Sequence, residues 1–66
     1  MELTEKARIR IEHWLKHSES HLNDYREFAE QLEAADMKAI AVHIRNMADL
    51  TDKSNKCLIE ALNALD

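Results

Sequence analysis

The sequence predicts an all-α fold, in which an antiparallel helical hairpin dimerises into a four-helix bundle. Three observations predict it: a composition without Gly or Pro, apolar residues at helical spacing along almost the whole chain, and one shift in the phase of that spacing near residue 36. The chain has 66 residues, enough for a single helical-hairpin domain over residues 1–66. The same composition excludes sandwiches, barrels and Gly-rich nucleotide-binding loops.

The first half of the chain carries an apolar stripe that predicts a helix over about residues 4–34. Thr4 is the expected N-cap, and Glu5 places a negative charge in the first turn, where it suits the helix dipole. The apolar residues occupy heptad positions a, d and e. The a positions are Ile11, Ser18, Tyr25 and Leu32, and the aromatic d positions are Trp14 and Phe28. We expect the three aromatic side chains of this stripe to pack in the core.

A second stripe predicts a helix over about residues 37–65, but its phase differs from that of the first. Its a positions are Met37, Ile44, Thr51, Leu58 and Leu65. The register slips by two residues, about 200° of rotation, so the two stripes would point in opposite directions on an unbroken helix. A turn at about residues 35–37 brings them face to face. Asp36 stands where Gly is usual, and it either adopts a left-handed conformation or caps the second helix.

Two helices of this kind leave part of each stripe uncovered, because three heptad positions are apolar and one neighbour covers about two. We therefore expect a homodimer of two hairpins related by C2 symmetry. Within each hairpin, a turn near residue 36 places residue i opposite roughly residue 72 − i.

Four histidines in 66 residues are the unusual feature of the composition. His13, His17 and His21 follow one another at four-residue steps, which place neighbouring rings one turn apart on one face, a geometry that lets two imidazoles chelate a transition metal. The level rule sets His17 near residues 55–57, and both His17 and Cys57 occupy position g. The predicted ligands are His13, His17, His21 and Cys57. Three histidines in a row cannot comfortably share one ion on a straight helix, so two of them and the Cys57 thiolate form a borderline-soft site for zinc, nickel or cobalt. His43 can join it only across a dimer interface.

Each of these residues also has a structural interpretation. Histidines on a charged helical flank are often simply solvated, and a free cysteine is commonly a small packed side chain. His21 occupies a d position, so it can belong to a polar layer that fixes the register of the bundle. The other members of that predicted layer are Ser18, Thr51, Ser54 and Asn55.

Charge and composition restrict the classes of function. A net charge of −4 argues against nucleic acid as a partner, and the chain lacks the run of about 18 apolar residues that a membrane span needs. A lone cysteine fits a reducing compartment, so we expect a cytoplasmic protein. We do not expect an enzyme, because the serines lie on helices without an evident oxyanion hole and the carboxylates lack a cleft.

The stretch E-H-W-L-K-H-S-E-S-H at residues 12–21, followed by Tyr25 and Phe28, resembles a group of short prokaryotic helical proteins with an H-W-x-x-H-x-x-x-H signature. The resemblance covers nearly the whole chain and implies a histidine-bearing helical hairpin that handles metal. In size and topology the chain is also similar to Rop, a plasmid copy-number regulator and hairpin dimer that binds paired RNA loops.

Three functional hypotheses follow. The leading one is a homodimer that binds a divalent transition metal through the histidines of its first helix, as an accessory, storage or sensing module. The alternative is a metal-independent structural or protein-interaction module. A Rop-like RNA regulator is the third, and it predicts binding that weakens steeply with salt.

Overall fold

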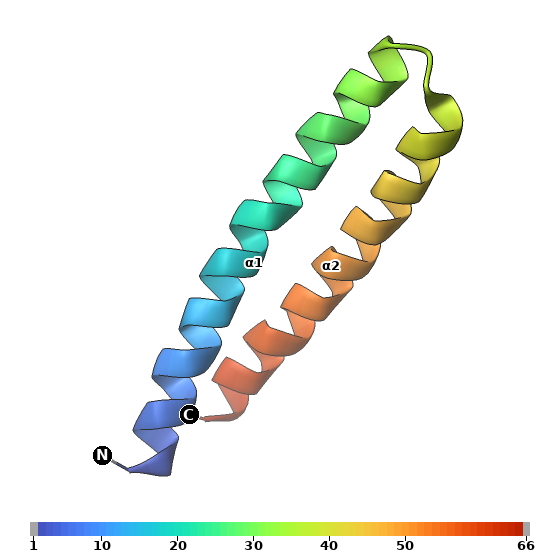
Figure 1. Cartoon of the computed structure of the whole chain (residues 1–66). Coiled ribbons are helices and arrows are strands. Elements are labelled where there is room, and N and C mark those ends of the chain that lie inside the picture. Colours follow the sequence, from blue (N-terminus) through green and yellow to red (C-terminus); the bar gives the residue numbers. More distant parts are fainter. Residues whose placement is uncertain (1, 66) are drawn as a thin grey trace.

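The computed structural model describes residues 2–65, and it contains two long helices that lie side by side in opposite directions (Figure 1). The first, α1, spans Leu3–Ala34, and the second, α2, spans Lys38–Ala64. The principal dimensions of the molecule are 51 × 15 × 11 Å. The prediction of an all-α antiparallel hairpin is confirmed, and the predicted helix bounds agree with the observed ones to within one residue.

The start of α1 differs from the expectation in its cap. The helix begins at Leu3, so the N-cap position belongs to Glu2, whose backbone is extended with φ −64° and ψ 155°. The backbone N–H of Lys6 donates to the carbonyl of Glu2 at 3.1 Å, and no side chain of residues 2–65 caps the helix. Thr4 therefore lies inside the first turn, and its predicted role as N-cap is wrong.

The turn between the helices is a Schellman motif, the hydrogen-bonded helix end that normally contains Gly. The N–H of Asp36 donates to the carbonyl of Glu33 at 3.0 Å, and the N–H of Met37 donates to that of Leu32 at 2.9 Å. Asp36 has φ 61°, in the left-handed region that Asp tolerates better than most residues. Of the two roles expected for Asp36 the left-handed one is correct, because α2 has Met37 at its N-cap and no side-chain cap.

The buried seam between the helices is narrow and made largely of small side chains. Its buried members are Leu22, Ala29 and Leu32 on α1, with Ala41, Ala48 and Asn55 on α2. All but Leu32 occupy heptad position e, and several a positions are half-buried beside them. The hairpin therefore closes along its a and e rows, where alanines allow the two backbones to approach.

The d row lies outside this seam. Trp14 and Phe28, expected in the core, each remain 51% exposed in the hairpin. One neighbouring helix covers the a and e rows, which lie about 40° apart, and the d row falls about 60° beyond them. The accessible surface is 5153 Å², against about 4,300 Å² for a compact monomer of this mass. The excess reflects the elongated shape of a molecule only two helices wide.

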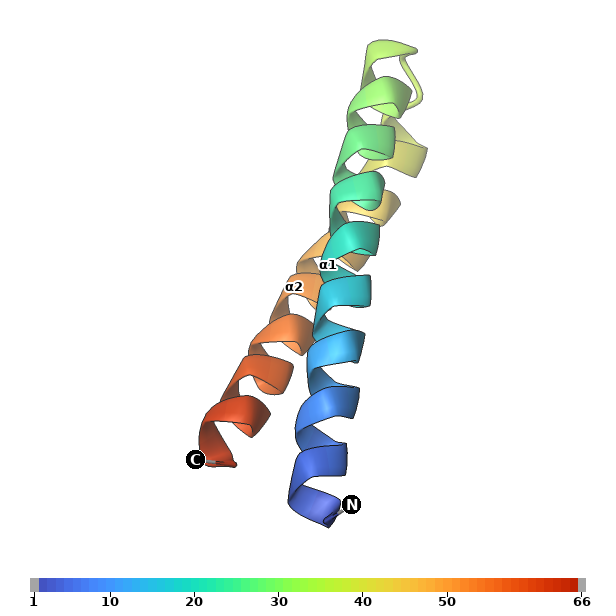
Figure 2. The same cartoon turned by 90° about the vertical axis from the view of Figure 1, so that its left-hand side faces the viewer.

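The helices are not strictly parallel to one another. Seen after a quarter turn, α1 and α2 cross, and the ends opposite the turn separate (Figure 2). Near the turn, an ion pair joins Arg45 on α2 to Glu33 on α1. Within residues 2–65, neither helix combines the length and the apolar character that crossing a bilayer requires.

Candidate functional site

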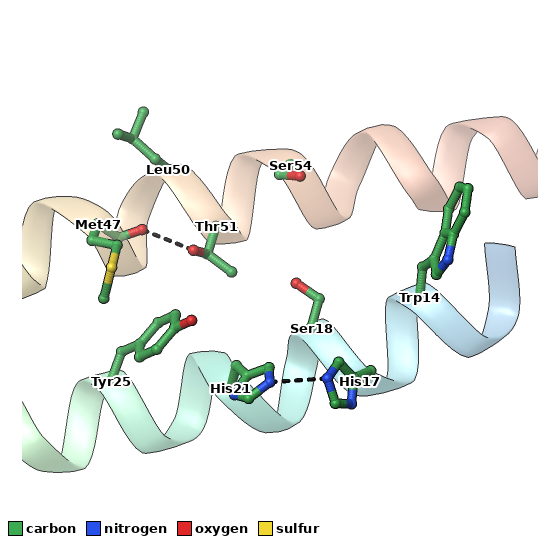
Figure 3. Close-up of a pocket in the computed structure, with 9 residues that line it drawn as sticks. All are labelled: Trp14, His17, Ser18, His21, Tyr25, Met47, Leu50, Thr51 and Ser54. Carbon is green, nitrogen blue, oxygen red and sulfur yellow. Dashed lines mark hydrogen bonds between the residues drawn. The ribbon is translucent and has the colours of Figure 1, made fainter.

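An open groove of about 480 Å³ runs between the helices near the middle of their length (Figure 3). Its α1 side carries Trp14, His17, Ser18, His21 and Tyr25, and its α2 side carries Met47, Leu50, Thr51 and Ser54. Imidazoles and hydroxyls thus lie between aromatic and aliphatic side chains. Two histidines of α1 therefore line the same groove as four residues of α2.

His17 and His21 form a pair at the edge of this groove. Their Nε2 atoms are 3.0 Å apart, and both side chains are exposed. The rings meet edge to face, with centroids 4.4 Å apart and planes at 87° (Figure 3). The four-residue step on a helix produces this approach without help from α2, because it places successive side chains one above the other.

The pair is the middle of a longer row of rings on α1. His13 stacks against His17 with centroids 6.1 Å apart and an interplanar angle of 10°. Tyr25 stacks against His21 at 6.0 Å and 12°. The spacing that predicted a histidine face on the first helix is therefore present as a continuous row of four rings.

The pair has the geometry of a two-nitrogen chelate. A transition metal binds imidazole nitrogen at about 2.0–2.1 Å. Because the two Nε2 atoms are 3.0 Å apart, an ion bound to both would have an N–metal–N angle of somewhat above 90°. A hydrogen bond between the same two atoms requires a proton on one of them, and a bound ion would take the place of that proton. Such an ion would have two ligands from this chain and two open coordination positions.

The predicted set of four ligands is not brought together within one chain. Cys57 is exposed, and it does not line the groove that contains His17. Among residues 2–65, no group of three or more His, Cys, Asp or Glu side chains is placed to hold a metal ion. The seam uses position e, so position g, which Cys57 occupies, stays exposed on α2. His43 also lies outside the groove.

The predicted polar layer exists, although with fewer members. Ser18 Oγ donates to Asn55 Oδ1 at 2.6 Å across the helices, and Asn55 is 4% exposed. Its Nδ2 atom has no hydrogen-bond partner among the described residues. Thr51 bonds instead to the carbonyl of Met47 on its own helix, at 2.9 Å. His21 is exposed, so its predicted place inside the seam is wrong for the single hairpin.

Sequence reasoning did not anticipate the apolar rim that Met47 and Leu50 form on the α2 side of the groove. Leu50 is 65% exposed and Met47 is 37% exposed. The sequence does contain evidence for part of this rim. The rule that pairs residue i with 72 − i sets Tyr25 opposite Met47, and both residues line the groove.

The fold and the groove define a class of small helical-hairpin domains with a histidine pair on the first helix. The chain belongs to the family described as a domain of unknown function, DUF8180, whose model matches residues 7–65. All the groove residues fall inside the matched range. Comparison with curated proteins and with solved structures found no match, so the resemblance to Rop stays a prediction.

Proposed function

We propose that this protein is a metal-binding helical module, in which His17 and His21 chelate a divalent transition metal such as zinc, nickel or cobalt. The observation that carries the proposal is the 3.0 Å separation of the two Nε2 atoms on exposed rings. His13, stacked on His17, is the nearest further imidazole on the same helix. The role is that of an accessory, storage or sensing module, without catalysis.

The proposal includes a homodimer as the working form. Trp14, Phe28 and Leu50 are more than half exposed, and they belong to the d and g rows that the seam leaves uncovered. A second hairpin on this face would form the four-helix bundle that the width of the apolar stripe favours.

Titration of zinc, nickel or cobalt into the purified protein at neutral pH tests the metal proposal directly. We expect dissociation constants below about 10 μM, and a loss of about tenfold or more in affinity for the double variant His17→Ala/His21→Ala. His43→Ala is the matched control, because it removes the same type of side chain from a surface outside the groove. Equal binding by the wild type and the double variant would reject the histidine pair as the site.

One alternative deserves a separate test, because the apolar rim favours it: a metal-independent protein-interaction module. In that case Met47 and Leu50 form a docking surface, and the histidines are incidental. This alternative predicts that chelators change neither the helix content nor the state of association. The metal-binding proposal is distinguished by the loss of metal binding in His17→Ala/His21→Ala, whereas this alternative predicts no binding that depends on those histidines.

A further inference from the structure

The histidine pair fills half of a tetrahedral coordination sphere. Structural zinc sites take four protein ligands, whereas His17 and His21 supply two, and residues 2–65 hold no group of three candidate ligands. Resting on the proposed function, we propose that a second copy completes the site. The two chains pack α1 against α1 in antiparallel orientation, and the partner's His17 and His21 provide the other two imidazoles on the two-fold axis.

The position of the pair along α1 supports this arrangement. Helix α1 runs from Leu3 to Ala34, so its midpoint lies between residues 18 and 19. The midpoint of the pair is residue 19. Two antiparallel copies of α1 that overlap along their full length therefore cross the two-fold axis within one residue of the pair. His17 of one chain then lies at the level of the partner's His21, and the reverse holds as well.

The distribution of charge along the open flank of α1 selects the antiparallel orientation. Lys6 and Arg10 line the same surface as Trp14 near the start of the helix. Asp24 and Glu27 occupy the same two heptad positions in the second half. Antiparallel packing brings the basic half of one helix to the acidic half of the other, with Arg10 near the level of the partner's Glu27. Parallel packing would oppose like charges.

The size of the open face also fits a second hairpin. A face of 51 × 15 Å has a projected area of about 750 Å², so two such faces bury about 1,500 Å² in total, a standard size for a stable interface. Trp14 and Phe28 on α1 and Leu50 on α2 would lose most of their exposure there. Those side chains would also exclude water from the imidazoles, which strengthens metal binding by neutral nitrogen ligands.

Metal stoichiometry measured together with the state of association is the first test. Cobalt(II) is titrated into the full chain under reducing conditions, which prevent a disulfide through Cys57, and the same samples are analysed by sedimentation velocity. We expect one cobalt ion per two chains, and a dimer that the chelator weakens. One ion per monomeric chain would overturn the shared site, but it would still support metal binding by His17 and His21 of one chain. No bound ion would overturn both, so the two failures are distinguishable.

Charge reversal tests the orientation of the helices. One variant carries Lys6→Glu and Arg10→Glu, and the other carries Asp24→Lys and Glu27→Lys. Alone, each places like charges along the whole flank and should dimerise more weakly than the wild type. Mixed, they restore opposite charges at both ends, so we expect the heterodimer to form about tenfold more tightly than either homodimer.

Comparison of each homodimer with the wild type tests the orientation, because parallel packing already opposes like charges in the wild type, so neither variant would then dimerise more weakly. The mixing experiment tests whether the flanks of the two α1 helices face each other. The two variants have net charges of about −8 and 0, so simple attraction between oppositely charged molecules does not produce a preference for the heterodimer. Circular dichroism of each variant shows whether the helices are intact before mixing. Folded variants that dimerise as tightly as the wild type would overturn the antiparallel orientation, and no preference for the heterodimer would overturn the packing of α1 against α1. Either result would overturn the proposed four-imidazole arrangement.

Discussion

The hydrogen bond between Ser18 and Asn55 offers the sharpest test of how the seam is held together. Asn55 is 4% exposed, its Oδ1 atom accepts a hydrogen bond from the Ser18 hydroxyl at 2.6 Å, and its Nδ2 atom has no hydrogen-bond partner within residues 2–65. Ser18→Ala removes the donor and leaves the buried amide oxygen unpaired as well, at a cost of about 1–3 kcal/mol. Asn55→Leu removes the amide altogether and buries apolar surface, so we expect a free energy of unfolding equal to or above that of the wild type.

A double-mutant cycle separates the hydrogen bond from repacking. In the Asn55→Leu background, Ser18→Ala should change stability by less than about 0.5 kcal/mol, because the half-buried hydroxyl no longer has a buried partner. The coupling energy is then about 1–2 kcal/mol, or several degrees in Tm for a chain of this size. Urea unfolding followed by circular dichroism measures it, at one fixed protein concentration because dimerisation shifts the midpoint. Equal effects of Ser18→Ala in both backgrounds would refute the reasoning.

Three further predictions concern the turn, the surface and the metal. Asp36→Gly should stabilise the hairpin by about 0.5–1 kcal/mol, because Gly adopts φ 61° without steric cost, and a lower Tm would contradict the Schellman assignment. Leu50→Glu should leave the helix content unchanged and abolish dimerisation in sedimentation experiments, since it places a charge on the open face; an intact dimer would exclude that face. Lowering the pH from about 7.5 to about 5.5 should weaken cobalt binding, because protons compete for imidazole nitrogen, and pH-independent binding would point to other ligands.

The ion pair between Arg45 and Glu33 contributes less to the stability of the hairpin than the buried seam does. The two side chains are 45% and 52% exposed, so water and salt screen their attraction. Its contribution to stability is therefore below about 0.5 kcal/mol, and the hairpin depends on the alanine-rich seam and on the turn.

Local sequence is enough to specify the features of this protein that depend on a single helix or on the turn. Strong helix formers and 3.6-residue spacing specify two helices, and the phase shift specifies a turn at Asp36, which can adopt a left-handed conformation. The approach of His17 to His21 is equally local, because any α-helix stacks residues four apart. These predictions did not depend on how the helices face each other.

Tertiary structure decided which rows of the wide apolar stripe became the seam. Ala29, Ala41 and Ala48 all occupy position e, and their small side chains let the backbones approach there, so each helix rotates to bury e and a. That rotation leaves Trp14 half exposed and leaves Cys57 exposed outside the seam. A heptad pattern with three apolar positions is compatible with more than one rotation, and side-chain volume across the interface selects one of them.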